Sequence, residues 1–373
     1  MIAVSELGRL QTAASQLSAA PSQEELNQKL AALPPVVYKI CPTTTIVTGL
    51  QTGFDPATTL PTFDPPGSLT IIIATPNVTL QCGDKGEVKD NCVLLHGATS
   101  IFTLAEFPPL GPFKFNTDNL VIEGFTLSGY MEGALSDGRR LESDTESMSC
   151  EMQDGRTKLN ENGSALFRNA ISVGASGRNI RVANILAEGL EGSVISLGGT
   201  RTAGPFSLVS SDNTIFASIK KTVIRDSLSY TGFFRSQRQS LKVTKTIVKN
   251  VEGCDVQEVL AQTEGVLFSC RGSGTKCTIR RTCISDSKFL SSLVMATAFF
   301  GDSKLPKAVS RGVRLQNVSI VPNEGTGIDF SPPSVCEDGL IGANVTCPCG
   351  TTEFECSALD IKDKACSFSL DFE

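Results

Sequence analysis

Aromatic residues and histidine are scarce in this chain. Its 373 residues include no tryptophan, three tyrosines and one histidine, His96. Clefts that bind sugars often use Trp or Tyr faces as platforms, so a deep sugar-stacking groove is not favoured. A single histidine excludes metal sites built from several histidines, and a Ser-His-Asp or Cys-His triad would have to use His96. In the run Leu94-Leu-His-Gly97 it is interpreted as a packed or surface residue, so no catalytic residue is assigned.

The chain also lacks long hydrophobic runs and an excess of positive charge. The longest apolar candidate, Phe289–Phe300, is short and interrupted by Ser and Thr, which predicts no membrane span. The net charge of −6 argues against general nucleic-acid binding, so no nucleic-acid partner is expected. The first residues show no charged segment followed by an apolar core, so no signal peptide is predicted within this chain.

Cysteine, in contrast, is abundant, with 13 residues. Two pairs bracket short polar loops, which is typical of disulfides formed in an oxidising compartment. The disulfide candidates are Cys82, Cys92, Cys270, Cys277, Cys349 and Cys356, with their connectivity left open. A metal site at Cys347-Pro-Cys349 with Cys356 is the weaker alternative, because no second Cys-x-x-Cys and no nearby histidine accompanies it. Because the count is odd, at least one thiol is free or pairs with another chain.

Four sequons for N-glycosylation support the same location. Their acceptors are Asn77, Asn162, Asn317 and Asn344. Together with the cysteines they predict a secreted, extracellular glycoprotein.

The chain divides into three regions by pattern. Residues 1–34 predict helices: Leu7, Leu10, Ala14 and Leu17 share one face, and Ser22 with Glu25 forms a capping box ahead of Pro34-Pro35. From residue 35 to 330, short β-rich runs alternate with Gly, Asn, Asp and Ser. Residues 331–373 form a cysteine-rich tail. The predicted domains are a helical cap, a β-rich body and this tail.

The β-rich body contains an internal repeat. In each of six segments, an apolar residue is followed by an apolar residue or a threonine three positions later, by an apolar residue at five and by a turn residue at seven. The leading residues are Ile122, Val182, Ile219, Val243, Ile279 and Leu315, and the residues at seven are Gly129, Gly189, Asp226, Asn250, Asp286 and Pro322. Gly, Asn and Asp tolerate a left-handed backbone corner.

Such a repeat predicts a solenoid, because no segment can bury its apolar side alone and stacked coils bury one continuous core. The spacing of 24 residues from Ile219 to Val243 suits one β-helical coil. The larger gaps of 60, 37 and 36 residues indicate long loops or extra, poorly marked coils. A β-sandwich is the alternative, although it would not need the turn residue to recur in register.

The pattern resembles the pectate-lyase-like superfamily of right-handed parallel β-helices. The likeness lies in Asn119-Leu-Val-Ile-Glu-Gly-Phe-Thr-Leu-Ser-Gly129, Asn179-Ile-Arg-Val-Ala-Asn-Ile-Leu-Ala-Glu-Gly189 and Lys276-Cys-Thr-Ile-Arg-Arg-Thr-Cys-Ile-Ser-Asp286. It implies an all-β, right-handed parallel β-helix with a short N-terminal helical cap. It implies no activity by itself, because function depends on the site.

The motifs of the enzymes in this superfamily are not matched. Polygalacturonase-like hydrolases carry Asn-Thr-Asp, Asp-Asp, Gly-His-Gly and Arg-Ile-Lys in that order, and only Asn116-Thr-Asp118 is present here. Elimination with an Arg or Lys base and Ca²⁺ stays open as an alternative. Eight acids between Glu132 and Glu161 could supply oxygen ligands, but their spacing fits no calcium loop. We interpret this stretch as a solvated insertion, and we expect no metal site or cofactor.

The repeat register predicts a ladder of basic residues. Two positions after the leading apolar residue stand Lys221, Lys245 and Arg281, with Lys220, Lys242 and Arg280 beside them. Equivalent positions in a β-helix stack about 4.8 Å apart, so like charges would repel. One hypothesis is that the ladder binds an acidic polysaccharide; the other is that these are solvated side chains relieved by acids from nearby loops. The preferred function is a non-catalytic structural or adhesive role with acidic-glycan binding, and the alternative is a polysaccharide lyase.

Overall fold

We describe a computed structural model of the chain. The described residues are 2–18, 21–48, 50–54, 61–64, 71–96, 100–103, 115, 117–129, 169–173, 178–190, 193–197, 216–229, 233–237, 240–253, 267–271, 276–285, 287, 294–297, 312–321, 359–361 and 370.

The described strands form two large sheets in which every pairing is parallel. The first sheet contains β1 (Val36–Ile40), β2 (Thr45–Thr48), β6 (Val78–Cys82), β7 (Cys92–His96), β9 (Val121–Glu123), β10 (Phe125–Gly129), β12 (Ile180–Glu188), β14 (Phe216–Ser229), β16 (Ser240–Gly253), β18 (Lys276–Ser285), β20 (Gly312–Val321) and β21 (Leu359–Ile361). The second contains β5 (Ile71–Ile73), β8 (Ile101–Thr103), β11 (Asn169–Val173), β13 (Ser193–Leu197), β15 (Phe234–Gln237), β17 (Phe268–Arg271) and β19 (Val294–Thr297). A small antiparallel pair joins β3 (Leu50–Phe54) to β4 (Pro61–Asp64).

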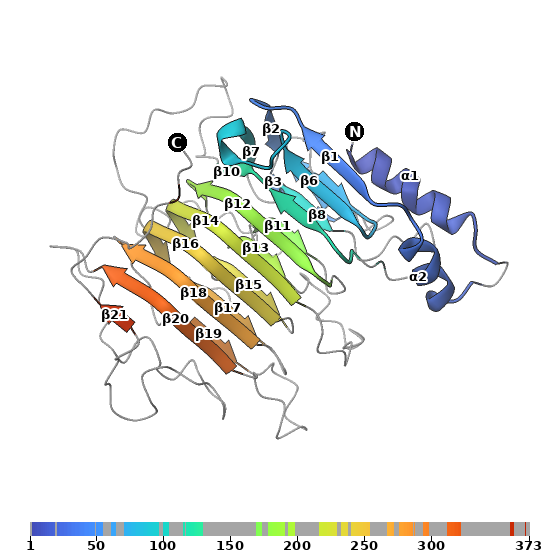
Figure 1. Cartoon of the computed structure of the whole chain (residues 1–373). Coiled ribbons are helices and arrows are strands. Elements are labelled where there is room, and N and C mark those ends of the chain that lie inside the picture. The colour runs from blue at the N-terminus through green and yellow to red at the C-terminus, as the bar shows by residue number, and fades with distance from the viewer. Residues whose placement is uncertain are drawn as a thin grey trace.

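Strands of the two sheets alternate along the chain, and successive strands of each sheet lie side by side (Figure 1). This arrangement confirms the all-β parallel β-helix fold and contradicts the β-sandwich alternative. From β1 to β19 each coil supplies one layer of strand to each sheet, and the apolar residues of these strands form one continuous core.

The register of the first sheet reproduces the repeat. Val182 pairs with both Ile122 and Ile219, and Val243 pairs with both Ile219 and Ile279. Segments separated by 60 residues in sequence are thus adjacent in the sheet, so no extra coil lies between them in this sheet. Two further rungs precede those of the repeat, because Leu80 pairs with Tyr38 on one side and Ile122 on the other.

The corners at the seventh position are left-handed at three of the four sites that the structure describes. Gly189, Asp226 and Asn250 have φ angles of 61°, 51° and 50°. For Gly129 the expectation of a left-handed corner is wrong, because its φ lies outside that region. A glycine is required there for space: a Cβ would overlap the carbonyl group of Gly189.

Two helices cover the N-terminal end of the solenoid (Figure 1). They are α1 (Ile2–Ala14) and α2 (Gln23–Ala31), within the region predicted to be helical. The predicted cap forms in part, because the backbone N–H of Glu25 donates to Ser22 Oγ at 3.1 Å, whereas the Glu25 carboxylate accepts from Ser18. Leu10, Ala13, Leu26, Leu30, Ile72, Ala74 and Phe115 form a second apolar cluster beneath the helices.

A buried carboxylate holds α1 to the first coils. Glu6 is fully buried, and its Oε2 accepts hydrogen bonds from the backbone N–H groups of Ala74 and Thr75 and from Thr75 Oγ1. Its Oε1 accepts from the Tyr38 hydroxyl at 2.8 Å. Burial raises the pKa of Tyr38, and the neighbouring carboxylate of Glu6 acts in the same direction.

At the other end, β21 of the tail pairs with Val318–Ile320 of β20. The tail therefore adds a rung to the first sheet. The helices of the described part of the chain include none that is long and apolar enough to cross a membrane.

Candidate functional site

The basic ladder lies where the coils turn a corner within the first sheet. Lys220 pairs with Thr244, and Thr222 pairs with Thr246. Lys221 and Lys245, which lie between these pairs, are therefore opposite each other in adjacent coils. Arg281 follows in the next coil, because Thr244 pairs with Arg280 and Thr246 with Thr282. The three residues thus occupy equivalent positions in successive coils, as predicted from the repeat.

The corner has a left-handed backbone that suits Lys and Arg poorly. The φ angles are 54° at Lys221, 57° at Lys245 and 51° at Arg281. Gly124 and Asn184 occupy the same corner in the two preceding coils, with φ angles of 88° and 52°. Gly and Asn adopt this conformation readily, whereas for other residues it costs on the order of 1 kcal/mol or more. The three basic side chains therefore stand at sites that local backbone preference would give to Asn or Gly.

The remaining predicted basic residues fall in two rows beside the corner. Lys220 and Arg280 lie in one row, since both pair with Thr244. Lys242 lies two residues before Thr244, in the row of Ser218 and Thr278. We call the six residues, Lys220, Lys221, Lys242, Lys245, Arg280 and Arg281, the basic face.

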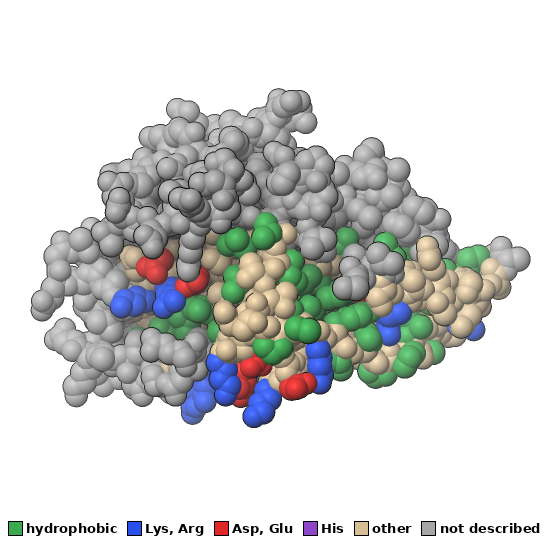
Figure 2. Space-filling model, turned by 90° about the horizontal axis from the view of Figure 1, so that it is seen from above, with side chains coloured by type: hydrophobic (Ala, Val, Ile, Leu, Met, Phe, Trp, Pro, Cys, Tyr) green, Lys and Arg blue, Asp and Glu red, His purple; other side chains and the backbone are tan. Residues whose placement is uncertain are grey.

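The ion pairs formed near this face join residues outside it. Arg225 and Glu188 form an ion pair at 2.8 Å, and Arg181 and Glu123 one at 3.6 Å, all four outside the face. Within the described part of the chain, no basic-face residue forms an ion pair. In Figure 2 the basic side chains of the visible surface gather in clusters with acidic ones beside them.

One atom of the basic face is both buried and unsatisfied. Nε of Arg280 is shielded from solvent and has no hydrogen-bond partner among the described residues. A buried donor without a partner costs about 1–3 kcal/mol, more when the group is charged. An acceptor brought by a ligand would therefore remove an existing penalty.

A disulfide-closed loop limits the basic face at its N-terminal side. In the coil of β6 the corner is enlarged into residues 83–91, which contain the 3₁₀-helix η1 (Val88–Asp90) between the bonded Cys82 and Cys92. We call the stacked corner residues of successive coils, Gly124, Asn184, Lys221, Lys245 and Arg281, the corner column. The loop contacts this column, because Asn184 Nδ2 donates a hydrogen bond to the Gly86 carbonyl oxygen at 2.8 Å. A Cβ on Gly124 would lie 2.5 Å from the Gly86 carbonyl carbon, so glycine is required at that position.

The loop brings one acid close to the first basic corner residue. The Glu87 carboxylate forms an ion pair with Lys89 at 2.7 Å. The hydrogen bond from Lys89 lowers the pKa of Glu87, and the charges of Lys89, Lys85 and Lys221 act in the same direction. Glu87 thus interacts electrostatically with Lys221, which gives partial support to the interpretation that nearby acids relieve the ladder.

The structure tests part of the cysteine prediction. Cys82 and Cys92 form a disulfide with a Cα–Cα distance of 5.7 Å. Cys277 is disulfide-bonded, as is Cys283, which was not among the candidates. The side chain of Cys270 lies outside the described residues, as do Cys349 and Cys356. Cys41 is a free, exposed thiol.

The other predicted sites are tested only in part. Asn77 lies ahead of β6 with a φ of 59°, whereas Asn162 and Asn344 and the side chain of Asn317 fall outside the described residues. The acid-rich stretch from Glu132 to Glu161 is also outside them. His96 ends β7, with its side chain not described. The described residues contain no cluster of three or more His, Cys, Asp or Glu that could hold a metal ion.

Comparisons with known proteins add little. No protein-family model matches the chain, and no curated protein does. Among solved structures, the chain is similar to a pectin methylesterase from Aspergillus niger in deglycosylated form. The identity is 11%, the TM-score is 0.31, and the match covers 84% of this chain and 86% of the other. A TM-score this low carries no argument, so the fold stands on the strand register described above.

Proposed function

We propose that the protein is an extracellular, non-catalytic binding protein that holds an acidic polysaccharide along its basic face. The observation that carries this proposal is the placement of Lys221, Lys245 and Arg281 at consecutive left-handed corners. Side chains that stack one per coil offer a row of cations at a regular spacing of about 4.8 Å. An extended chain with repeating carboxylate or sulfate groups is a ligand that such a row suits.

Charge and strain support this choice. The basic face belongs to a chain with a net charge of −6, so it is a local feature and not part of a generally basic surface. Three stacked cations repel one another and occupy strained backbone positions, and both effects destabilise the fold. Their presence is easier to account for if the side chains bind a ligand. The Cys82–Cys92 disulfide supports an oxidising, extracellular location.

Binding to a panel of polysaccharides tests the proposal. The purified protein is titrated with a polyuronate, a sulfated polysaccharide and a neutral glucan at several salt concentrations, with and without calcium. We expect salt-sensitive binding to the acidic polymers, because exposed charge pairs are screened by salt.

The decisive variant is K221N/K245N/R281N. Asn removes the charge and accepts the left-handed corner, as Asn184 does in the adjacent coil, so loss of binding cannot be attributed to misfolding. Affinity should fall about 10- to 100-fold, since each exposed ion pair contributes up to about 1 kcal/mol. The matched control K29Q/K39Q/K249Q removes three cations outside the basic face and should retain the affinity. Equal losses in both variants, or no binding to either acidic polymer, would overturn the proposal.

A further inference from the structure

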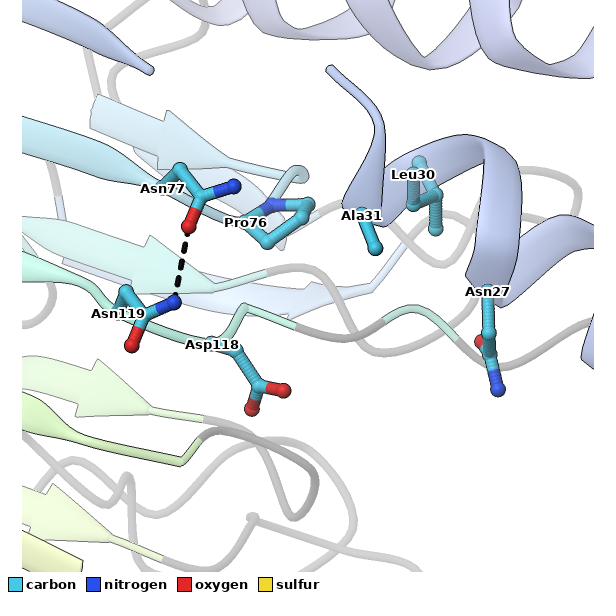
Figure 3. A pocket seen from close by; sticks show the side chains of 7 residues that line it. All are labelled: Asn27, Leu30, Ala31, Pro76, Asn77, Asp118 and Asn119. Atoms are coloured by element: carbon cyan, nitrogen blue, oxygen red, sulfur yellow. Dashed lines mark hydrogen bonds between the residues drawn. The ribbon is translucent and has the colours of Figure 1, made fainter. Parts of the chain in front are cut away.

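A small groove lies between helix α2 and the residues that immediately precede strands β6 and β9 (Figure 3). Its volume is about 170 Å³. One side is formed by α2 and the other by residues ahead of β6 and β9; the lining includes Asn27, Leu30, Ala31, Pro76, Asn77 and Asp118. The groove is therefore amphipathic, with apolar carbon on Leu30, Ala31 and Pro76 and amide or carboxylate groups around them.

Asn77 is the last member of a ladder of asparagines at this corner. Asn77, Asn119 and Asn179 all have left-handed φ angles, between 55° and 59°. Asn179 Nδ2 donates to Asn119 Oδ1 at 3.0 Å, and Asn119 Nδ2 donates to Asn77 Oδ1 at 2.9 Å. The hydrogen bonds thus run in one direction, and within the described structure Asn77 Nδ2 is the one amide nitrogen of the ladder that donates to no neighbour.

The same residue is the one member of the ladder within a sequon. Thr79 completes Asn77-Val-Thr, whereas Asn119 and Asn179 are followed two positions later by Val121 and Arg181. A glycan on Nδ2 of Asn119 or Asn179 would replace a proton of the donating group that holds the ladder together. On Asn77 it leaves Oδ1 free to keep accepting from Asn119. Sequence and hydrogen-bond direction therefore point to the same nitrogen.

We propose that Asn77 carries an N-linked glycan whose first N-acetylglucosamine lies in the groove and fastens α2 to the solenoid. Attachment forms a bond between Nδ2 and the anomeric carbon of that sugar. It breaks the bond from the same carbon to the diphosphate of a lipid-linked oligosaccharide donor, and it releases one of the two Nδ2 protons. The sugar ring presents an apolar face to Pro76 and Ala31 and hydroxyl groups to Asn27 and Asp118. This proposal is independent of polyanion binding.

Peptide mapping by mass spectrometry tests the attachment. The chain is secreted from a eukaryotic host together with a reporter that carries a known occupied sequon. We expect the Asn77 peptide to carry a glycan in the wild type and in T79S, and none in T79A. Thr79 lies on β6 outside the asparagine ladder, so T79A removes the sequon and keeps the hydrogen bonds of Asn77. An unmodified Asn77 peptide beside an occupied reporter would overturn the proposal.

Amide hydrogen exchange tests whether the first sugar lies in the groove. Three forms are compared: the full glycoform, the form trimmed by an endoglycosidase to one N-acetylglucosamine, and T79A. Exchange of the amides of residues 26–31 should be equally slow in the first two forms and at least about threefold faster in T79A, because one sugar suffices to contact α2. Equal exchange in all three forms, or loss of protection on trimming, would contradict the proposal that the first N-acetylglucosamine lies in the groove against α2.

Discussion

Asn184 Nδ2 donates a hydrogen bond to the carbonyl oxygen of Gly86 at 2.8 Å, across 98 residues of sequence. The bond joins the disulfide-closed loop to the corner column, immediately before the coil in which that column becomes basic. Asn184 also has a left-handed φ of 52°, so one residue both forms a corner and binds the loop at the end of the basic face.

Replacing Asn184 separates these two roles. N184G keeps a residue that accepts the left-handed corner and loses the hydrogen bond, so the free energy of unfolding should fall by about 1 kcal/mol. N184A also forces an alanine into that corner and should lose about 2 kcal/mol. Chemical denaturation measures both values. Equal losses in the two variants would show that the corner conformation contributes nothing.

At the basic corners, substitution by asparagine should raise the stability. K245N relieves backbone strain and removes repulsion between stacked cations, so the free energy of unfolding should increase by roughly 0.5–1 kcal/mol. K245A removes the same charge but not the strain, and it should increase the stability less. Denaturation curves in low salt decide this. A K245N protein less stable than K245A would show that Lys245 is not strained.

The sequence could predict the rungs because apolar side chains at fixed spacing must face one core. It could not predict the left-handed corner at Lys221, Lys245 and Arg281, because neither Lys nor Arg carries a local signal for that conformation. Gly124 and Asn184 occupy the same position in the two preceding coils. Because Gly and Asn favour a left-handed backbone, they indicated this conformation, but the prediction did not use them. The first two coils do not show the repeat spacing because each has extra residues at the corner. In the second coil Cys92, and not a residue next to Cys82, pairs with Phe125, and in the first coil Ile40 pairs with Cys82 but Thr45 with Val93.

The inner face of the basic coils contains a stack of threonines. Thr222, Thr246 and Thr282 pair in register and are fully buried, and no hydroxyl of the three has a hydrogen-bond partner in the described structure. A buried hydroxyl without a partner costs about 1–3 kcal/mol, and valine has nearly the same shape. T246V should therefore raise the free energy of unfolding by about 1 kcal/mol. The control T278V changes an outward, partly exposed threonine of β18 and should leave the stability within about 0.5 kcal/mol; a destabilised T246V protein would contradict the prediction.

Glu6 should be the residue of α1 most sensitive to substitution. E6A leaves the buried N–H groups of Ala74 and Thr75 without an acceptor, and the free energy of unfolding should fall by about 3 kcal/mol or more. E6Q keeps one acceptor oxygen in the same place and should lose less. Urea denaturation provides the comparison, with Q11A, on the exposed side of α1, as the neutral control. An E6A protein as stable as Q11A would show that the helical cap does not depend on this carboxylate.

The pH dependence of ligand binding should report the electrostatic interaction between Glu87 and Lys221. The hydrogen bond from Lys89 lowers the pKa of Glu87, so Glu87 stays charged to lower pH than an ordinary glutamate. Its contribution to stability is present above its unfolded-state pKa and is lost as the pH falls through the lowered pKa of the folded state.

Protonation of Glu87 also removes a negative charge beside Lys221. Affinity for a sulfated polysaccharide, whose sulfates stay ionised, should therefore rise as the pH falls through that same pKa. E87Q should bind more tightly than wild type at neutral pH and show a smaller rise, whereas K89Q should move the rise to higher pH by removing the main cause of the lowered pKa. Calorimetric titrations between neutral and acidic pH measure these curves. Superimposable curves for wild type and E87Q would show that the charge of Glu87 does not affect binding. The bound polymer would then lie away from the disulfide-closed loop, farther along the corner column toward Arg281.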